Sequence, residues 1–175
     1  MAQRVTVENG PVRRQVDAEE GCMNLLPDWA PNIHPFLVHF PIALLSTAAA
    51  VDLVGWVFRR NKPLRQIATV LYVLGTGAAA ATYFTGRAAS QTIWLPGMAQ
   101  AVLREYWDWA FRTVWFFAIV TLVRLWLLHR SRRDPGPAVI AALALAGLVG
   151  IGLLLETGDR GGRLVYRHGV GTVRE

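Results

Sequence analysis

Charged residues and cysteine are both scarce in this chain. Asp, Glu, Lys and Arg together make up 17% of the 175 residues, whereas apolar and aromatic types make up 53%. This balance is too apolar for an ordinary water-soluble domain. The single cysteine, Cys22, cannot form an internal disulfide, and no apolar segment precedes it as a lipoprotein site would require.

Motifs of several enzyme and cofactor classes are also missing. The sequence has no H-E-x-x-H, no C-x-x-C, no C-x-x-C-H haem attachment motif, no phosphate-binding loop and no nucleophile elbow. The first 35 residues lack the apolar core of a signal peptide. The absence of these motifs favours a protein without independent catalytic activity, and an enzyme is the alternative.

Long apolar runs are what the chain does have. Four of them, residues 36–58, 66–85, 110–128 and 138–156, can cross or nearly cross about 30 Å of hydrocarbon as helices rising ~1.5 Å per residue. We predict an all-α fold: a four-helix transmembrane bundle over residues 32–175 with a Gly-rich C-terminal fold-back. Residues 1–31, punctuated by Pro11, Pro27 and Pro31, are expected to form an extended extra-membrane arm.

Basic residues concentrate in the loop between helices one and two and in the loop between helices three and four: Arg59, Arg60, Lys62, Arg65, Arg130, Arg132 and Arg133. Short loops rich in Lys and Arg are typical of the cytoplasmic side of a membrane. The pattern predicts a multi-pass protein of the bacterial inner membrane with both termini on the periplasmic side. It also explains the net charge of +6 by topology, without a nucleic-acid partner.

Small residues recur every four positions in two of the predicted helices. Helix two carries Gly75 and Ala79, and helix four carries Ala142, Ala146 and Gly150. Because small residues at this spacing let helix backbones approach closely in lipid, we expect helices two and four to touch. The alternative is that these alanines face lipid.

Aromatic residues gather between helices two and three, in the segment 87–109 that we interpret as a loop. Trp94, Tyr106, Trp107 and Trp109 lie there, and such residues are typical of the membrane–water interface. The alternative is a stacking platform for a cofactor or a quinone ring.

Ionisable residues within the spans need partners, because a charge at membrane depth is costly. Asp52 and Arg124 lie at matching depths near the cytoplasmic ends of helices one and three, so we predict an ion pair. Arg112 and Glu156 lie at the opposite face and could form a second pair. Both pairs are interpreted as structural links between helices.

Histidines cluster at the predicted outer face. His34 and His39 flank the start of helix one, where Pro41 removes a backbone amide and should bend the helix. Five glycines between residues 157 and 172 should let the chain turn back towards the mouth of the bundle. We therefore expect His168 to face His39.

Two stretches resemble a known family. H-P-F-L-V-H-F-P-I-A-L (residues 34–44) and G-G-R-L-V-Y-R-H-G-V-G (residues 161–171) look like the motifs of a bacterial family of four-helix membrane proteins named Domain of Unknown Function twenty-two thirty-one. The resemblance runs from helix one to the C-terminus and implies the same fold and topology. Members usually carry a further histidine near the start of helix three, where this chain has Tyr106 and Trp107.

Three functions fit these features. The first is an accessory subunit that braces a respiratory or photosynthetic electron-transfer complex, with lipid and other membrane subunits as its partners. The second is a haem b-binding subunit with His39 and His168 as axial ligands, supported by an apolar bundle. Its surrounding residues would be His34, Arg163 and Tyr166. The third is a transport protein, or one that holds Zn²⁺ or Cu with its histidines.

Overall fold

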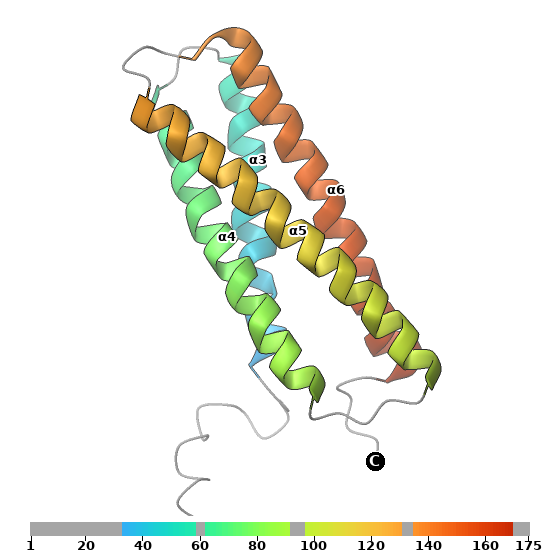
Figure 1. The fold of residues 1–175 in the computed structure, drawn as a ribbon. Coiled ribbons are helices and arrows are strands. Elements are labelled where there is room, and N and C mark those ends of the chain that lie inside the picture. Colours follow the sequence, from blue (N-terminus) through green and yellow to red (C-terminus); the bar gives the residue numbers. More distant parts are fainter. Residues whose placement is uncertain (1–32, 59–61, 92–96, 131–134, 170–175) are drawn as a thin grey trace, which may run out of the picture. The chain divides into compact units, whose positions relative to one another are not determined.

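The computed structural model describes residues 33–58, 62–91, 97–130 and 135–169, which are helical almost throughout. A short helix, α2 (His34–Leu37), precedes α3 (His39–Val57). Three long helices follow: α4 (Lys62–Gln91), α5 (Gly97–Arg130) and α6 (Pro137–His168). Four helical segments, the first made of α2 and α3 together, are long and apolar enough to cross a membrane. The all-α four-helix bundle is therefore confirmed (Figure 1), whereas the predicted arm lies outside the described residues.

The four long helices form a ring in which α3 and α5 each pack against both α4 and α6. Successive helices run in opposite directions, so α3 and α5 end, and α4 and α6 begin, at one end, called here the paired-loop end (Figure 1). The start of α2 and the end of α6 lie towards the other end, called here the terminal end (Figure 1). Leu45, Tyr72 and Phe117 fill the centre and are fully buried.

The close approach predicted for helices two and four is not found, because no backbone contact joins α4 and α6 among the described helices. The two helices meet instead through the Tyr72 side chain of α4, which reaches Gly147 of α6. A Cβ at Gly75 of α4 would lie 2.7 Å from the Leu45 side chain of α3, and one at Gly150 of α6 would lie 2.5 Å from Phe117 of α5. The small residues thus make room for large side chains of adjacent helices. Their spacing predicts close packing but does not specify the neighbour.

The helices extend well beyond the predicted spans at the terminal end. α4 continues to residue 91, and α5 begins at residue 97, so most of the segment 87–109 is helical and its interpretation as a loop is wrong. Hydropathy reports which residues are buried in lipid. A helix satisfies its own backbone hydrogen bonds and can therefore continue into water, where hydropathy no longer marks it.

The Gly-rich segment does not fold back within the described residues, because α6 remains helical from residue 157 to residue 168. An ion pair of 2.6 Å between Asp159 and Arg163, one turn apart, supports this part of the helix. Gly161 packs on the Tyr106 ring of α5. The helix ends at Gly169, whose positive φ of 64° suits a left-handed cap.

The start of the first span is interrupted at Val38, between α2 and α3 and close to the bend predicted at Pro41. Proline at position 41 cannot donate a backbone hydrogen bond to the carbonyl of Leu37. The hydroxyl of Thr82 in α4 donates to that carbonyl instead, at 3.2 Å. A side chain from a neighbouring helix therefore satisfies the group that proline frees, as is common for prolines in membrane helices.

Candidate functional site

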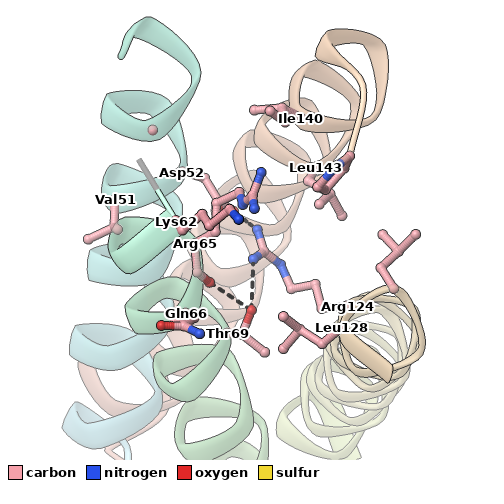
Figure 2. A pocket seen from close by; sticks show the side chains of 13 residues that line it. Val51, Asp52, Lys62, Arg65, Gln66, Thr69, Arg124, Leu128, Ile140 and Leu143 are labelled. Carbon is pink, nitrogen blue, oxygen red and sulfur yellow. Dashed lines mark hydrogen bonds and ion pairs between the residues drawn. The ribbon is translucent and has the colours of Figure 1, made fainter. Parts of the chain in front are cut away.

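A pocket of about 240 Å³ opens at the paired-loop end and is lined by all four long helices. Its polar lining comes from the last turns of α3, the first turns of α4 and the end of α5: Asp52, Lys62, Arg65, Gln66, Thr69 and Arg124. Figure 2 shows Lys62 and Arg65 reaching from α4 towards the middle of the pocket, beside Asp52 and Arg124. Its apolar lining comes mainly from α5 and α6.

An ion pair lies at the base of this polar group. Arg124 of α5 donates to the carboxylate of Asp52 in α3, the partner that matching depth predicts, across the diagonal of the bundle. The two side chains are only 3% and 7% exposed. A charge removed from water to this extent must be paired, because the desolvation penalty of a lone charge amounts to several kcal/mol. The pair links two helices between which no backbone contact exists among the described residues.

Two residues of α4 complete the surroundings of Arg124. The guanidinium lies over the ring of Tyr72, 4.3 Å from its centroid, in a cation–π contact. It also donates to the hydroxyl of Thr69 at 3.5 Å, while Thr69 donates to the carbonyl of Arg65 at 2.8 Å. Arg124 is thereby held by α3 and α4 as well as by its own helix.

Tyr72 is itself fixed by close packing. Its ring is fully buried and lies 6.1 Å from that of Phe117, centroid to centroid. A Cβ at Gly147 of α6 would lie 2.7 Å from the Tyr72 hydroxyl, so only glycine leaves room for this ring to reach across the bundle. The cluster of Asp52, Tyr72 and Arg124 therefore contacts all four long helices. Such a cluster can hold the helices together, and its Arg124 lies beside the bases Lys62 and Arg65 in the lining of the pocket.

Sequence reasoning does not identify Tyr72 and Thr69 as part of this site. It explains Lys62 and Arg65 by membrane topology alone and does not predict that they line a pocket. A signal for them exists. Positions 62, 65, 69 and 72 are spaced three or four residues apart and therefore share one face of a helix. That face can be recognised in the sequence, but its direction towards Arg124 cannot.

The terminal end holds the histidines singled out by the sequence. His34 is half-buried in α2, and its Nδ1 lies 3.4 Å from the hydroxyl of Thr85. A Cβ at Gly86 would lie 2.6 Å from the His34 ring, so the imidazole rests directly on the backbone of α4. His39, by contrast, is exposed in the first turn of α3. The two histidines that flank the start of the first span therefore have different surroundings.

The described helices do not bring His39 and His168 together. Gly147 of α6 approaches Ala49 of α3 closely, which sets the register of these antiparallel helices. Ten residues before Ala49 is His39, and ten residues after Gly147 is residue 157. His168 lies eleven residues further along the straight helix, an axial offset of about 16 Å at ~1.5 Å per residue. One iron atom cannot bind both imidazoles in this arrangement.

The other residues assigned to this end have different neighbours. Tyr166 is 90% exposed, and Arg163 pairs within its own helix. Glu156 pairs with Arg160 on α6 rather than with Arg112. The guanidinium groups of Arg112 and Arg160 both lie against the Trp109 ring, at 5.4 Å and 4.6 Å. This end of α5 and α6 is thus joined by an aromatic–cation contact.

No group of three or more His, Cys, Asp and Glu side chains is placed to hold a metal ion within the part of the chain that the structure describes. The Zn²⁺ or Cu alternative depends on His34, His39 and His168, all of which lie in that part. The proposal of a shared metal site therefore has no geometric support from these helices.

A group of aromatic rings covers the outward faces of α4 and α5 towards the terminal end. It is called here the α4–α5 aromatic cluster: Tyr83, Phe84, Trp107, Phe111 and Trp115. Tyr83 lies at its centre, with ring centroids 5.6 Å from Phe84, 5.3 Å from Trp107 and 6.3 Å from Phe111. Phe111 and Trp115 continue it at 6.0 Å. Phe84, Phe111 and Trp115 are each at least half exposed.

Comparison with known proteins gives one family and no individual relative. No curated protein and no solved structure matches the chain. A family model described as predicted membrane protein (DUF2231) matches residues 30–174, which covers α2 to α6. The four apolar helices agree with that description, and the chain therefore belongs to the DUF2231 family of predicted membrane proteins.

Proposed function

We propose that this membrane protein is an accessory subunit that braces a larger bacterial respiratory or photosynthetic electron-transfer complex. The α4–α5 aromatic cluster is the observation that carries this proposal. Aromatic side chains provide much of the binding energy of protein interfaces, because they bury a large area at a small cost in conformational entropy. The N-terminal arm would add contacts at the periplasmic side.

The depth of the cluster favours a protein partner over lipid alone. Aromatic belts lie at the level of the lipid headgroups. From Trp107 to Trp115 the cluster extends over eight residues of α5, or about 12 Å along the helix axis. Trp115 falls five residues inside the apolar run that begins at residue 110. The cluster thus reaches from the interface into the hydrocarbon, as a contact with a neighbouring transmembrane helix would.

A paired set of variants tests the proposal. The protein is purified in mild detergent from its native membrane as wild type, as Phe111→Ala/Trp115→Ala and as Leu145→Ala/Leu155→Ala. The leucines of the control are exposed on α6, away from the cluster. We expect the wild type and the control to migrate with a large complex on native gels, and the aromatic variant to migrate alone. A difference spectrum of the complex, reduced minus oxidised, should show redox cofactors.

Three results would contradict this function in whole or in part. If the wild type migrates at the mass of a single chain in its detergent micelle, it belongs to no larger complex and the proposed bracing role is wrong. Loss of the complex in the leucine control as well would show that any exposed apolar surface has the same effect. A complex without redox cofactors would refute the electron-transfer assignment while leaving the subunit role in place.

The haem b alternative stays a prediction with a simple test. With His39 and His168 offset along the bundle, each histidine would need another ligand, or the two would need two different groups. A visible spectrum of the purified protein decides the matter. An α-band on reduction that disappears in His39→Ala would support haem, and a colourless protein would exclude it.

A further inference from the structure

We infer that the pocket at the paired-loop end binds the phosphate headgroup of an anionic phospholipid. This site is independent of the α4–α5 aromatic cluster, which lies at the other end of the bundle. The inference combines the charge of the pocket, a buried donor on Arg124, and the division of the lining into a polar and an apolar part.

Charge is the first part of the argument. Three basic side chains and one acidic side chain line the pocket among the described residues: Lys62, Arg65, Arg124 and Asp52. Basic pockets between transmembrane helices are a recurring site for anionic lipid headgroups. Asp52 is already paired with Arg124. The formal charge contributed by these four residues is therefore positive, and an anion entering the pocket would meet two further bases on α4.

Arg124 supplies the second, independent observation. Its side chain lines the pocket and is 97% buried. Its Nε has no hydrogen-bond partner within the described residues, although its two terminal nitrogens bond Asp52 and Thr69. A buried donor left unsatisfied costs about 1–3 kcal/mol, and an anion in the pocket beside this guanidinium would offset that cost through charge attraction.

The shape of the lining identifies the ligand as an amphiphile. Two of the three bases, Lys62 and Arg65, lie on α4, whereas the apolar lining comes from α5 and α6, which contribute Leu127, Leu128, Ile140 and Leu143. Leu128 is 49% exposed, so this apolar wall is continuous with the outer surface of the bundle. A phosphate group could bind the bases while its acyl chains followed the leucines towards the membrane. A fully soluble anion has no apolar part that could pack against these leucines and Ile140.

The size of the pocket agrees with a headgroup rather than a larger cofactor. Its volume of about 240 Å³ lies below the ~300–1,000 Å³ usual for pockets that enclose a whole drug-sized ligand. A lipid needs only its polar group enclosed. The pocket and the neighbouring lipid would share the rest of the molecule.

The experiment measures lipid binding to the full chain in detergent by native mass spectrometry. Phosphatidylglycerol is compared with zwitterionic phosphatidylcholine of the same chain length, and inorganic phosphate is added in a separate series. The variants are Arg65→Gln and Lys62→Gln in the pocket. Arg130→Gln is the matched control, because this substitution also removes one positive charge at the same end of the bundle. Arg130 contacts Trp126 and does not line the pocket.

We expect phosphatidylglycerol to bind more tightly than phosphatidylcholine. Each pocket variant should weaken that binding about fivefold to tenfold, while Arg130→Gln changes it less than twofold. Equal affinity for the two lipids, or equal loss in Arg130→Gln, would overturn the inference by showing non-specific attraction. If inorganic phosphate competes as well as the lipid does, the pocket is a site for a free anion and the lipid assignment is wrong. Thermal melting without added lipid shows whether each variant is folded. The lipid affinities of the two pocket variants are each compared with that of the wild type.

Discussion

The two ends of this bundle hold the first span, made of α2 and α3, by different chemistry. At the paired-loop end, Arg124 joins Asp52 of α3 and Tyr72 of α4 through charge and a cation–π contact. At the terminal end, α2 rests on α4 where the His34 ring meets the backbone of Gly86. The first arrangement depends on a few strong and costly interactions, and the second depends on close fit.

This difference shows how a membrane bundle can be stabilised without a hydrophobic driving force between its helices. Lipid is as apolar as the core, so helices associate through packing and polar contacts. An ion pair supplies a large energy, but only if it is complete. Close packing supplies many small contributions, each lost separately. The two ends should therefore respond to substitution on different scales.

The largest effect is expected from breaking the ion pair on one side only. Arg124→Leu leaves the carboxylate of Asp52 buried without its partner, which typically costs about 3–5 kcal/mol of stability. The free energy of unfolding, measured by denaturation in mixed micelles, should fall by that order. The double variant Asp52→Leu/Arg124→Leu leaves no lone charge and should lose much less. Equal losses in the two variants would show that the pair matters for its packing and not for its charge.

A smaller effect is expected where the terminal end is packed most closely. In Gly86→Ala the new methyl group would lie 2.6 Å from the His34 ring, and overpacking of this kind costs about 1–3 kcal/mol. Gly77→Ala is the matched control on the same helix, because nothing lies within 4 Å of a Cβ there. The control should be neutral or slightly stabilising, since alanine favours the helix.

A double variant sharpens this test. If the clash with the imidazole is the cause, His34→Ala should restore most of the stability lost in Gly86→Ala. An undiminished loss in the double variant would place the cause elsewhere, within α4 itself. The comparison needs the melting temperatures, in one detergent, of four proteins: the wild type, Gly86→Ala, His34→Ala and the double variant.

The smallest effect is expected from the threonine pairs, which occur in both halves of the bundle. Thr76 and Thr121 join α4 to α5, and Thr113 and Thr157 join α5 to α6, each with 2.9 Å between hydroxyl oxygens. Thr76→Val and Thr113→Val should each cost about 0.6 kcal/mol, the mean for hydrogen bonds between membrane helices. If the two variants lose similar amounts of stability, the two ends differ in the ion pair and the close packing described above and not in their threonine pairs. A loss several times larger in one variant would reveal a third type of support.

The pair between Asp52 and Arg124 could be anticipated because depth in a membrane can be counted from the helix ends. Its neighbour Tyr72 could not, since that contact depends on how α4 is rotated about its axis. The close backbone approach of α4 and α6 was predicted wrongly for a related reason. Gly75 shows that a close approach exists, but whether Leu45 or α6 occupies the space depends on the order of helices in the ring.

The histidines illustrate the same limit. Their location at one end follows from counting spans, and His34 and His39 begin the first span as expected. The distance between His39 and His168 depended on whether the Gly-rich segment bends. Glycine permits a bend but does not require one, and in the structure this segment is helical, with Gly161 beside the Tyr106 ring of α5.

By itself, the sequence determined four apolar helices that alternate in direction, because an apolar run in lipid must satisfy its backbone hydrogen bonds within a helix. Only the tertiary structure decided which helices are neighbours, and therefore that Arg124 meets Tyr72 and Asp52 beside a pocket. The physical reason is that helix order and rotation arise from side-chain packing between segments far apart in the chain, which no local pattern records.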